Sequence, residues 1–277
     1  MKERVLYELH KIEQEKNIRV LYACESGSRA WGFPSTDSDY DIRFIYINEP
    51  KWYLSILEKR DVVERMIPFP IPLSAELPED KEHSPKYTEL DFSGWDLKKA
   101  LRLFRKSNPA IMEWIHSPIV YWNPYDFSGT LRSIVTEYFS YTASSYHYLH
   151  MAHGNFKDYL KADTVWTKKY FYVLRPLLAV KWMEQGRGIP PVDFVDLVNK
   201  IDISDVLREA IHGLIGQKKA GKELGRGSKN HVISAFIEME MDKYLKMKFQ
   251  HPRPSAPVDI LDDIFLNFLD GIYGYIS

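Results

Sequence analysis

Two acidic residues separated by one position follow a glycine-serine pair within a short stretch of the chain. The pair is Gly27-Ser28, and the acids are Asp39 and Asp41. Apolar runs predict one strand over residues 18–24, just before the pair, and a second over residues 42–47, just after the acids. Because side chains alternate along a strand, both carboxylates are expected on the same face. Gly27 would let a phosphate approach the backbone, and Ser28 adds a hydroxyl donor.

Paired carboxylates beside a phosphate-binding turn favour a hard divalent cation. Mg²⁺, or Mn²⁺ in its place, takes one or two protein carboxylates and fills its other positions with water and phosphate oxygens. Asp37 lies among turn-forming residues and is left out of the metal site. The pattern therefore indicates phosphoryl transfer that depends on a metal ion.

Three basic residues are candidates for contacts with the triphosphate of an NTP. Arg29 adjoins the Gly-Ser turn, and Arg43 shares the strand parity of Asp39 and Asp41. Either could contact phosphate oxygens through its forked guanidinium or pair with the nearby acids. Lys168 is two helical turns from Arg175, so these two residues could form one side of a nucleotide cleft or a solvated helix face.

The combined pattern resembles the nucleotidyltransferase superfamily related to DNA polymerase β. Its signature is a Gly-Ser turn followed by a strand with two carboxylates, and Gly27-Ser28 with Asp39-Tyr40-Asp41 matches it. More narrowly, residues 27–32 and 38–46 resemble the bacterial and phage family of predicted nucleotidyltransferases that includes YcgL and the RNA-ligase-associated RlaP proteins. Residues 94–101, 113–121 and 174–179 extend the resemblance over most of the chain.

The resemblance implies a third carboxylate on a neighbouring strand, between apolar residues. Asp91, within Leu90-Asp91-Phe92, fits this description best. Asp96 has similar neighbours but lies where a helix is expected to begin. In such enzymes the third carboxylate ligates the catalytic metal and draws the proton from the acceptor hydroxyl. We therefore expect Asp39, Asp41 and Asp91 to be both the metal ligands and the catalytic residues.

The elements that position these residues change in character along the chain. Helices over residues 2–16 and 95–105, with strands over 18–24, 42–47 and 87–92, predict an N-terminal half that contains both. Residues 66–86 contain five prolines, which predict a long loop or flap rather than a helix or a central strand. Such a connection could be a working lid or a poorly ordered excursion.

The second half carries almost only helical signals. Turn-forming residues cluster at 116–130, where we place a domain boundary near residue 125. Helices are expected over residues 130–152, 164–185, 203–219, 231–249 and 258–271. The predicted fold class is α+β. A polymerase β-type nucleotidyltransferase domain with a mixed sheet (residues 1–125), as the resemblance implies, precedes an all-helical domain (residues 126–277).

Composition excludes several classes of protein. The chain has 37 basic and 38 acidic residues, so it lacks the positive charge of a protein that coats nucleic acid nonspecifically. No apolar run approaches the roughly 18–20 residues of a membrane-spanning helix, and the first residues contain no signal-peptide core. With Cys24 as the single cysteine, we expect a cytoplasmic protein without disulfides and without membrane partners.

The hypothesis that follows is a nucleotidyltransferase that moves an NMP from an NTP to an acceptor hydroxyl and releases pyrophosphate. RNA, tRNA, a protein hydroxyl and a small molecule remain open as acceptors, and the oligomeric state is also open. One alternative is a nucleotide- or RNA-binding module that retains the fold without transfer. Another is a hydrolase or nuclease that uses the same acids.

Overall fold

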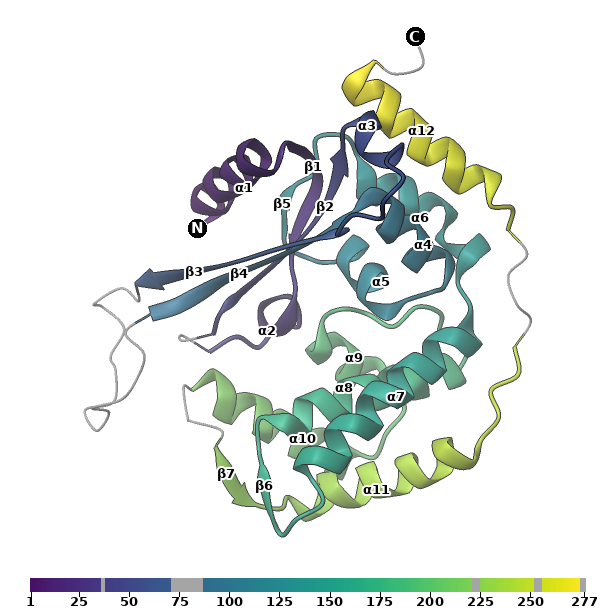
Figure 1. Ribbon diagram of the computed structural model, residues 1–277. Helices are drawn as coiled ribbons and strands as arrows, with labels where there is room; N and C mark the ends of the chain where they lie inside the picture. Colours follow the sequence, from purple (N-terminus) through teal and green to yellow (C-terminus); the bar gives the residue numbers. More distant parts are fainter. Residues whose placement is uncertain (36–37, 71–86, 221–224, 252–255, 275–277) are drawn as a thin grey trace. The chain divides into compact units, whose positions relative to one another are not determined.

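The computed structural model describes residues 1–35, 38–70, 87–220, 225–251 and 256–274 (Figure 1). Contacts divide the chain into two compact units, each assembled from segments distant in sequence. Unit 1 comprises Met1–Gly27, Asp39–Phe139 and Pro254–Ser277; unit 2 comprises Ser28–Ser38 and Ser140–Arg253. These boundaries differ from a single division near residue 125, and that domain boundary stays a prediction.

Unit 1 is built on a five-stranded sheet with the order β3-β4-β2-β1-β5. Its strands are β1 (Ile18–Glu25), β2 (Tyr40–Asn48), β3 (Val62–Pro70), β4 (Tyr87–Asp96) and β5 (Val120–Trp122). Neighbours β2 and β4 are parallel, whereas the other pairs are antiparallel. The chain therefore has the expected α+β class with a mixed sheet.

The two faces of the sheet contact different helices, because side chains alternate along each strand. Ile42, Phe44 and Tyr46 of β2 share a buried cluster with Val5 and Leu9 of α1 (Lys2–Lys16). On the opposite face, the ring of Trp95 lies 3.9 Å from that of Trp114, centroid to centroid. Figure 1 shows α1 on one side of the sheet and three helices on the other: α4 (Leu97–Arg105), α5 (Pro109–Ile115) and α6 (Phe127–Tyr138).

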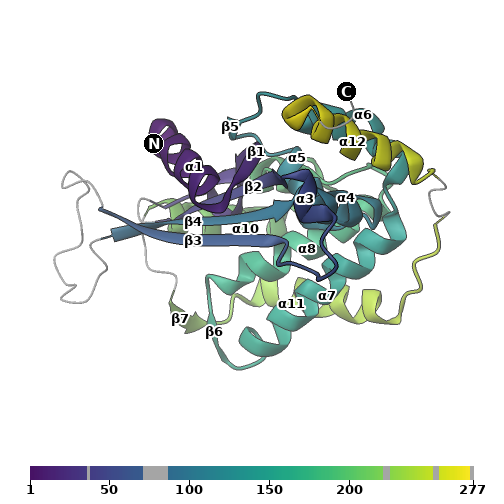
Figure 2. The same cartoon turned by 45° about the horizontal axis from the view of Figure 1, so that its top comes forward.

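The last helix of the chain, α12 (Asp259–Tyr273), belongs to unit 1. Its Phe265 ring lies 4.9 Å from the ring of Tyr53, in the short helix α3 (Pro50–Tyr53), and its Phe268 ring lies 5.9 Å from that of Phe127. Figure 2 shows α12 beside α6. Sequence reasoning had placed this helix in a separate C-terminal domain.

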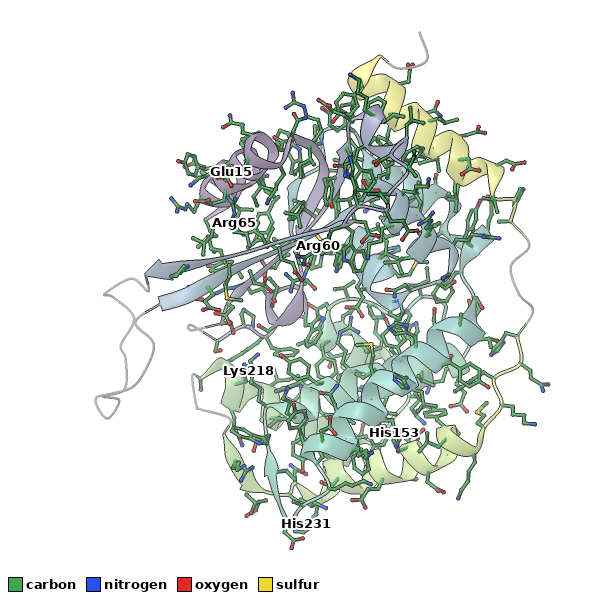
Figure 3. All side chains as sticks on the ribbon, viewed as in Figure 1. Glu15, Arg60, Arg65, His153, Lys218 and His231 are labelled. Carbon is green, nitrogen blue, oxygen red and sulfur yellow. The ribbon has the colours of Figure 1, made fainter. Side chains whose placement is uncertain are left out.

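Strand β3 corrects the prediction that a loop begins at residue 66. Residues 66–70 belong to β3, and Pro68 is paired in register with Glu89. Proline is tolerated there because β3 is the edge strand of the sheet, where one side of the backbone has no ladder partner among the described residues. Arg65 of β3 forms an ion pair with Glu15 of α1 (Figure 3). The rest of the predicted flap, residues 71–86, lies outside the described residues.

Unit 2 is mainly helical, with α8 as its most deeply buried helix. Its helices are α7 (Tyr141–Tyr159), α8 (Lys169–Glu184), α9 (Phe194–Lys200), α10 (Asp205–Lys219) and α11 (His231–Lys246). It also contains a small antiparallel ribbon of β6 (Thr164–Trp166) and β7 (Arg226–Ser228). The expectation of an all-helical second half is therefore wrong at this ribbon.

Two predicted helices have different bounds in the structure. The expected helix at 130–152 is interrupted at Phe139 and Ser140, because Ser140 caps α7 by accepting a hydrogen bond from the Ala143 amide, 3.2 Å away. The expected helix at 164–185 begins only at Lys169, since Thr164, Val165 and Trp166 form β6. β-branched and aromatic residues favour a strand at that point.

The segment after the Gly-Ser pair packs within unit 2. Phe33 is buried, and its ring stacks on that of Phe171 at 4.5 Å. The Phe194 amide donates a hydrogen bond of 3.0 Å to the Trp31 carbonyl oxygen. Trp31 and Phe33 are therefore held by residues of the helical unit.

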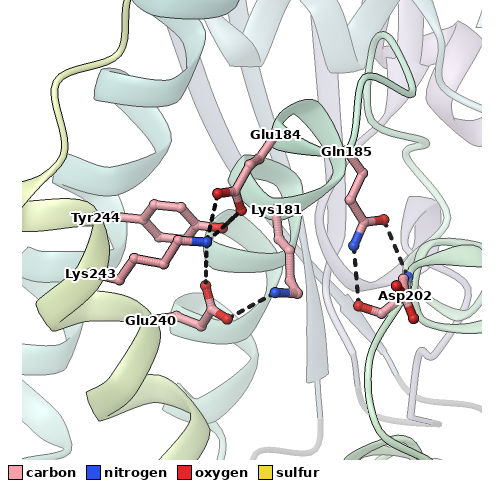
Figure 4. A network of polar contacts seen from close by, with 7 residues as sticks. All are labelled: Lys181, Glu184, Gln185, Asp202, Glu240, Lys243 and Tyr244. Atoms are coloured by element: carbon pink, nitrogen blue, oxygen red, sulfur yellow. Dashed lines mark hydrogen bonds and ion pairs between the residues drawn. The ribbon is translucent and has the colours of Figure 1, made fainter.

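Helices α8 and α11 are also joined by charged groups (Figure 4). Glu240 is buried and pairs with Lys181 at 2.9 Å. Lys243 pairs with Glu184 at 2.6 Å, and the Tyr244 hydroxyl donates a hydrogen bond of 2.7 Å to the same carboxylate. This network joins α8 to α11 and extends from the buried Glu240 to the exposed Lys243.

Candidate active site

Gly27 stands at the end of β1, where the helical turn α2 (Gly27–Ala30) begins. Its φ of +58° lies in the left-handed region that favours glycine. A Cβ atom at this position would lie 2.1 Å from Oδ2 of Asp41, closer than any real contact. The Asp41 carboxylate therefore requires glycine here, and the approach of a phosphate to Gly27 stays a prediction.

Asp41 and Asp91 lie side by side on parallel strands. They are register partners between β2 and β4. One nitrogen of Arg43, Nη2, is 3.1 Å from Oδ1 of Asp41 and 2.9 Å from Oδ2 of Asp91. Both carboxylates are about two-thirds buried, since their side chains are 31% and 32% exposed. The structure thus brings together the two carboxylates that sequence reasoning assigned to different strands.

Arg43 uses its guanidinium within this cluster. Its Nη2 contacts the two carboxylates, and its Nη1 donates a hydrogen bond of 2.9 Å to the main-chain oxygen of Asp91. Of the two alternatives for this residue, pairing with nearby acids is the one observed. Arg43 therefore offsets the repulsion between Asp41 and Asp91 and fixes their spacing.

Asp39 precedes the first residue of β2 and points toward β4. Its Oδ1 accepts hydrogen bonds from the Glu89 amide at 2.9 Å and from the Thr88 hydroxyl at 3.3 Å. These bonds connect the start of β2 to the strand that carries Asp91. Asp39, Asp41 and Asp91 are consequently all located at the same end of the β2–β4 pair.

Glu25 is a residue of this region that sequence reasoning missed. It is fully buried at the end of β1, and its Oε1 accepts a hydrogen bond of 2.7 Å from the Asp41 amide. Its Oε2 accepts a hydrogen bond from the Tyr121 hydroxyl. Tyr121 lies in β5, within the stretch predicted to be a domain boundary. An acid directly after the apolar run at 18–24 was the available signal.

Asp96 has a different environment from Asp91. Its carboxylate caps α4 by accepting a hydrogen bond of 2.9 Å from the Lys98 backbone amide. It also accepts hydrogen bonds from the Asn48 side-chain amide at 2.8 Å and from the Tyr53 hydroxyl at 2.7 Å. Burial raises the pKa of Asp96, although these hydrogen bonds act in the opposite direction. Its oxygens therefore hold the start of a helix, which supports Asp91 over Asp96 as the third carboxylate.

The remaining predicted residues lie in unit 2. Ser28 follows Gly27 directly in α2, and Nη2 of Arg29 donates a hydrogen bond of 2.7 Å to the Ser38 carbonyl oxygen. Lys168 is exposed at the start of α8. Arg175, expected to share its face, is instead buried and donates to the Val192 carbonyl oxygen. The roles of Ser28, Arg29 and Lys168 stay predictions.

Carboxylate oxygens are suitable donors for Mg²⁺ or Mn²⁺. Asp41 and Asp91 fit such an ion in type and adjacency, but the Arg43 guanidinium that bridges them would compete with the ion for their oxygens. Across the described parts of the chain, no group of three His, Cys, Asp or Glu side chains is arranged to hold a metal ion. In those same parts, no helix has the length and apolar character needed to cross a membrane.

A mixed sheet with carboxylates on adjacent parallel strands, beside a Gly-Ser turn, is typical of the general nucleotidyltransferase fold. The family described as "RNA repair pathway DNA polymerase beta family" (RlaP) matches residues 1–267, and the chain belongs to this family. The family resemblance expected from the sequence is thereby confirmed.

Two individual proteins give further comparison. The "Uncharacterized protein YcgL" of Bacillus subtilis (strain 168) is 45% identical over 246 residues, which cover 89% of this chain and 87% of that protein. A crystal structure of a nucleotidyltransferase-like protein from Exiguobacterium sibiricum 255-15 aligns over 95% of this chain and 89% of the other. Its TM-score is 0.33 and its identity 10%, which is too low a likeness to define the fold.

Proposed function

We propose that this chain is a metal-dependent nucleotidyltransferase that moves an NMP from an NTP to an acceptor hydroxyl. The observation that carries the proposal is the adjacency of Asp41 and Asp91, which contact the same nitrogen of Arg43 beside Gly27. The family's description adds RNA to the acceptors to be tested, together with tRNA, proteins and small molecules.

In the proposed reaction, the acceptor oxygen attacks the α-phosphorus while the bond to the β-phosphate oxygen breaks and pyrophosphate leaves. Asp39, Asp41 and Asp91 would hold Mg²⁺ or Mn²⁺. When bound, that ion would neutralise charge that develops on the phosphate oxygens. Asp91 would accept the proton of the acceptor hydroxyl. Ser28, Arg29, Arg43 and Lys168 would contact the NTP, through hydroxyl and cationic donors to its phosphates.

The ion pairs of Arg43 also favour a second candidate function. An arginine that already neutralises Asp41 and Asp91 suits a nucleotide- or RNA-binding module that performs no transfer. Such a protein would bind an NTP with or without a divalent metal and would release no pyrophosphate. Transfer and binding alone therefore differ in a measurable product.

The decisive experiment incubates the full chain with each α-labelled NTP, Mg²⁺ or Mn²⁺, and cellular RNA or protein. We expect metal-dependent pyrophosphate release with label on one acceptor fraction, and loss of both in Asp41→Asn and Asp91→Asn. Asp262→Asn, at an exposed position of α12, is the matched control and should retain activity. NTP binding without pyrophosphate would favour the binding module, and phosphodiester cleavage without NTP would contradict both candidates.

A further inference from the structure

The β6–β7 ribbon of unit 2 has one buried and one exposed face. Trp166 pairs with Arg226, and Thr164 pairs with Ser228, so these four side chains share one face. All four are exposed, whereas Val165 on the other face is completely buried. We call the four residues the ribbon face. It combines an aromatic ring, a guanidinium group and two hydroxyl groups on one side of the ribbon.

Aromatic rings on the ribbon face, and on the two helices that precede and follow β6 in the chain, are in contact with cations. The Arg226 guanidinium lies 5.3 Å from the centre of the Trp166 ring. At the junction of α7 and α8, the Lys169 ammonium lies 4.4 Å from the Tyr159 ring and 4.8 Å from the Tyr172 ring. The three aromatic residues remain 43%, 36% and 38% exposed. Rings left accessible among cations are typical of surfaces on which bases stack.

The chain segment that contains β6 carries more positive than negative charge, although the whole chain is nearly neutral. Residues 157–169 contain four lysines and two aspartates, in a chain whose formal net charge is −1. Arg226 adds a further positive charge from the facing strand. Phosphate groups therefore find a local excess of cations here, next to rings that accept bases.

We propose that the ribbon face, with Tyr159, Lys169 and Tyr172, binds single-stranded RNA. Bases stack on the rings and on the Arg226 guanidinium, while the cations and hydroxyl groups contact phosphates and riboses. An acidic peptide would use the cations but would leave the exposed rings without stacking partners. That this RNA is also the acceptor of the NMP rests on the proposed transferase function. The binding of RNA does not depend on that function.

Binding is tested with the full chain and a labelled single-stranded RNA of about 12 nucleotides, by fluorescence anisotropy without NTP. Trp166→Ala and Arg226→Ala should each weaken binding about tenfold, and Trp166→Phe should restore most of the loss. Arg226→Ala should also lower the dependence of log Kd on log salt by about one unit. Tyr7→Ala is the control, since Tyr7 is an exposed ring of unit 1 that also lies beside an arginine.

Circular dichroism and thermal midpoints establish that the variants are folded. Folded Trp166→Ala and Arg226→Ala proteins that bind RNA as tightly as the unchanged chain would overturn the proposal. The proposal would also be overturned if the protein bound vesicles of anionic lipid, or an acidic peptide, more tightly than RNA and this binding depended on Trp166. Asp41→Asn should bind RNA normally, so loss of transfer in that variant leaves the binding result intact.

Discussion

Gly27 and Asp41 illustrate how one residue type determines the position of another in the site. Gly27 has no side chain to displace the Asp41 carboxylate, and it has a positive φ. Gly186 has a comparable φ of +70°, but a Cβ atom there would meet nothing within 4 Å. The two glycines therefore separate backbone strain from crowding of the carboxylate.

Gly27→Ala should abolish nucleotidyl transfer, because the new methyl group must move Asp41 or the turn itself. Gly186→Ala should carry only the backbone cost, about 1 kcal/mol of unfolding free energy, and retain transfer. Urea denaturation and pyrophosphate release measure the two effects. Normal activity in Gly27→Ala would show that the position of Asp41 is not critical.

Asp91 and Asp96 form a second informative pair, since both are candidates for the third carboxylate. Asp96→Asn should lower the unfolding free energy by about 1–3 kcal/mol. The two carboxylate oxygens of Asp96 accept hydrogen bonds from three donors, and asparagine keeps only one oxygen that can accept them. The Asp96→Asn variant should retain transfer if the protein stays folded. Asp91→Asn should change stability by less than about 1 kcal/mol and abolish transfer.

The pH dependence provides a check on Asp96. Its pKa is raised in the folded chain, so its contribution to stability is present below the unfolded pKa and is lost as the pH rises through the folded value. Asp96→Asn should remove this part of the pH profile in equilibrium unfolding. The roles of third carboxylate and helix cap would be reversed by a different result. In that case Asp96→Asn would leave the pH profile of stability unchanged but lose transfer, and Asp91→Asn would retain transfer.

Among single residues, the sequence predicted those site residues that can be recognised from their spacing along the chain. Gly27 next to a strand and Asp41 on the following strand both follow from the order of residues. Glu25 was missed because an acid is buried only when tertiary partners such as Tyr121 satisfy it. The ion pairs of Arg43 were left open because they depend on which strand lies beside β2.

At the scale of elements, charged groups on α8 and α11 hold two helices together. Glu240 has a side chain that is only 3% exposed, whereas Glu238 on the same helix is 54% exposed and lies 3.7 Å from Lys229. These two glutamates thus compare a buried and an exposed ion pair within one helix.

Glu240→Ala should lower the unfolding free energy by about 2 kcal/mol, since Lys181 loses its carboxylate and α11 loses packing. Glu238→Ala should change it by less than about 0.5 kcal/mol. Urea denaturation monitored by circular dichroism measures both. Equal effects in the two variants would mean that the buried pair contributes no more than a surface pair.

The same network adds a pH dependence through Glu184. Burial raises the pKa of Glu184. Hydrogen bonds from Lys243 and Tyr244, together with the charge of Lys243, lower this pKa by more than burial raises it, so the net shift is downward. Its stabilisation is therefore present above the unfolded pKa, about 4.5, and is lost as the pH falls through the folded value. Lys243→Ala should reduce the loss of stability in that acidic range.

Long amphipathic elements were predicted well, and short or exceptional ones were not. Helices α1, α10 and α12 agree closely with the periodic segments that predicted them. Helices α5 and α9 were missed because each has only 7 residues, too few to establish a helical period. Strand β3 was missed because its prolines are compatible only with an edge, and edge position is a property of the whole sheet.

For the whole molecule, the two units are not successive halves of the chain. Segment 28–38 packs in unit 2, and α12 packs in unit 1. Contacts between residues so far apart in sequence leave no local pattern, so the sequence favoured a single boundary near residue 125. The fate of a fragment that ends there tests that boundary.

A fragment of residues 1–125 should fail to unfold cooperatively. It lacks Phe171 and Phe194, which bury Phe33 in the full chain, and it lacks all of α12. Exposing one large aromatic side chain costs about 2–3 kcal/mol, a sizeable part of the stability of a domain. Near-ultraviolet circular dichroism during urea denaturation should give a sharp transition only for the full chain. A sharp transition in the fragment would support the boundary near 125.

The outer edge of β3 has a consequence for self-association at high concentration. An edge strand presents unpaired N–H and C=O groups to which a strand of another molecule can add. Pro68 has no N–H to donate, and in sheets proline occurs where its nitrogen faces away from the neighbouring strand. Within the described residues, this edge therefore lacks a donor near the end of β3, which opposes growth of the five-stranded sheet into an aggregate.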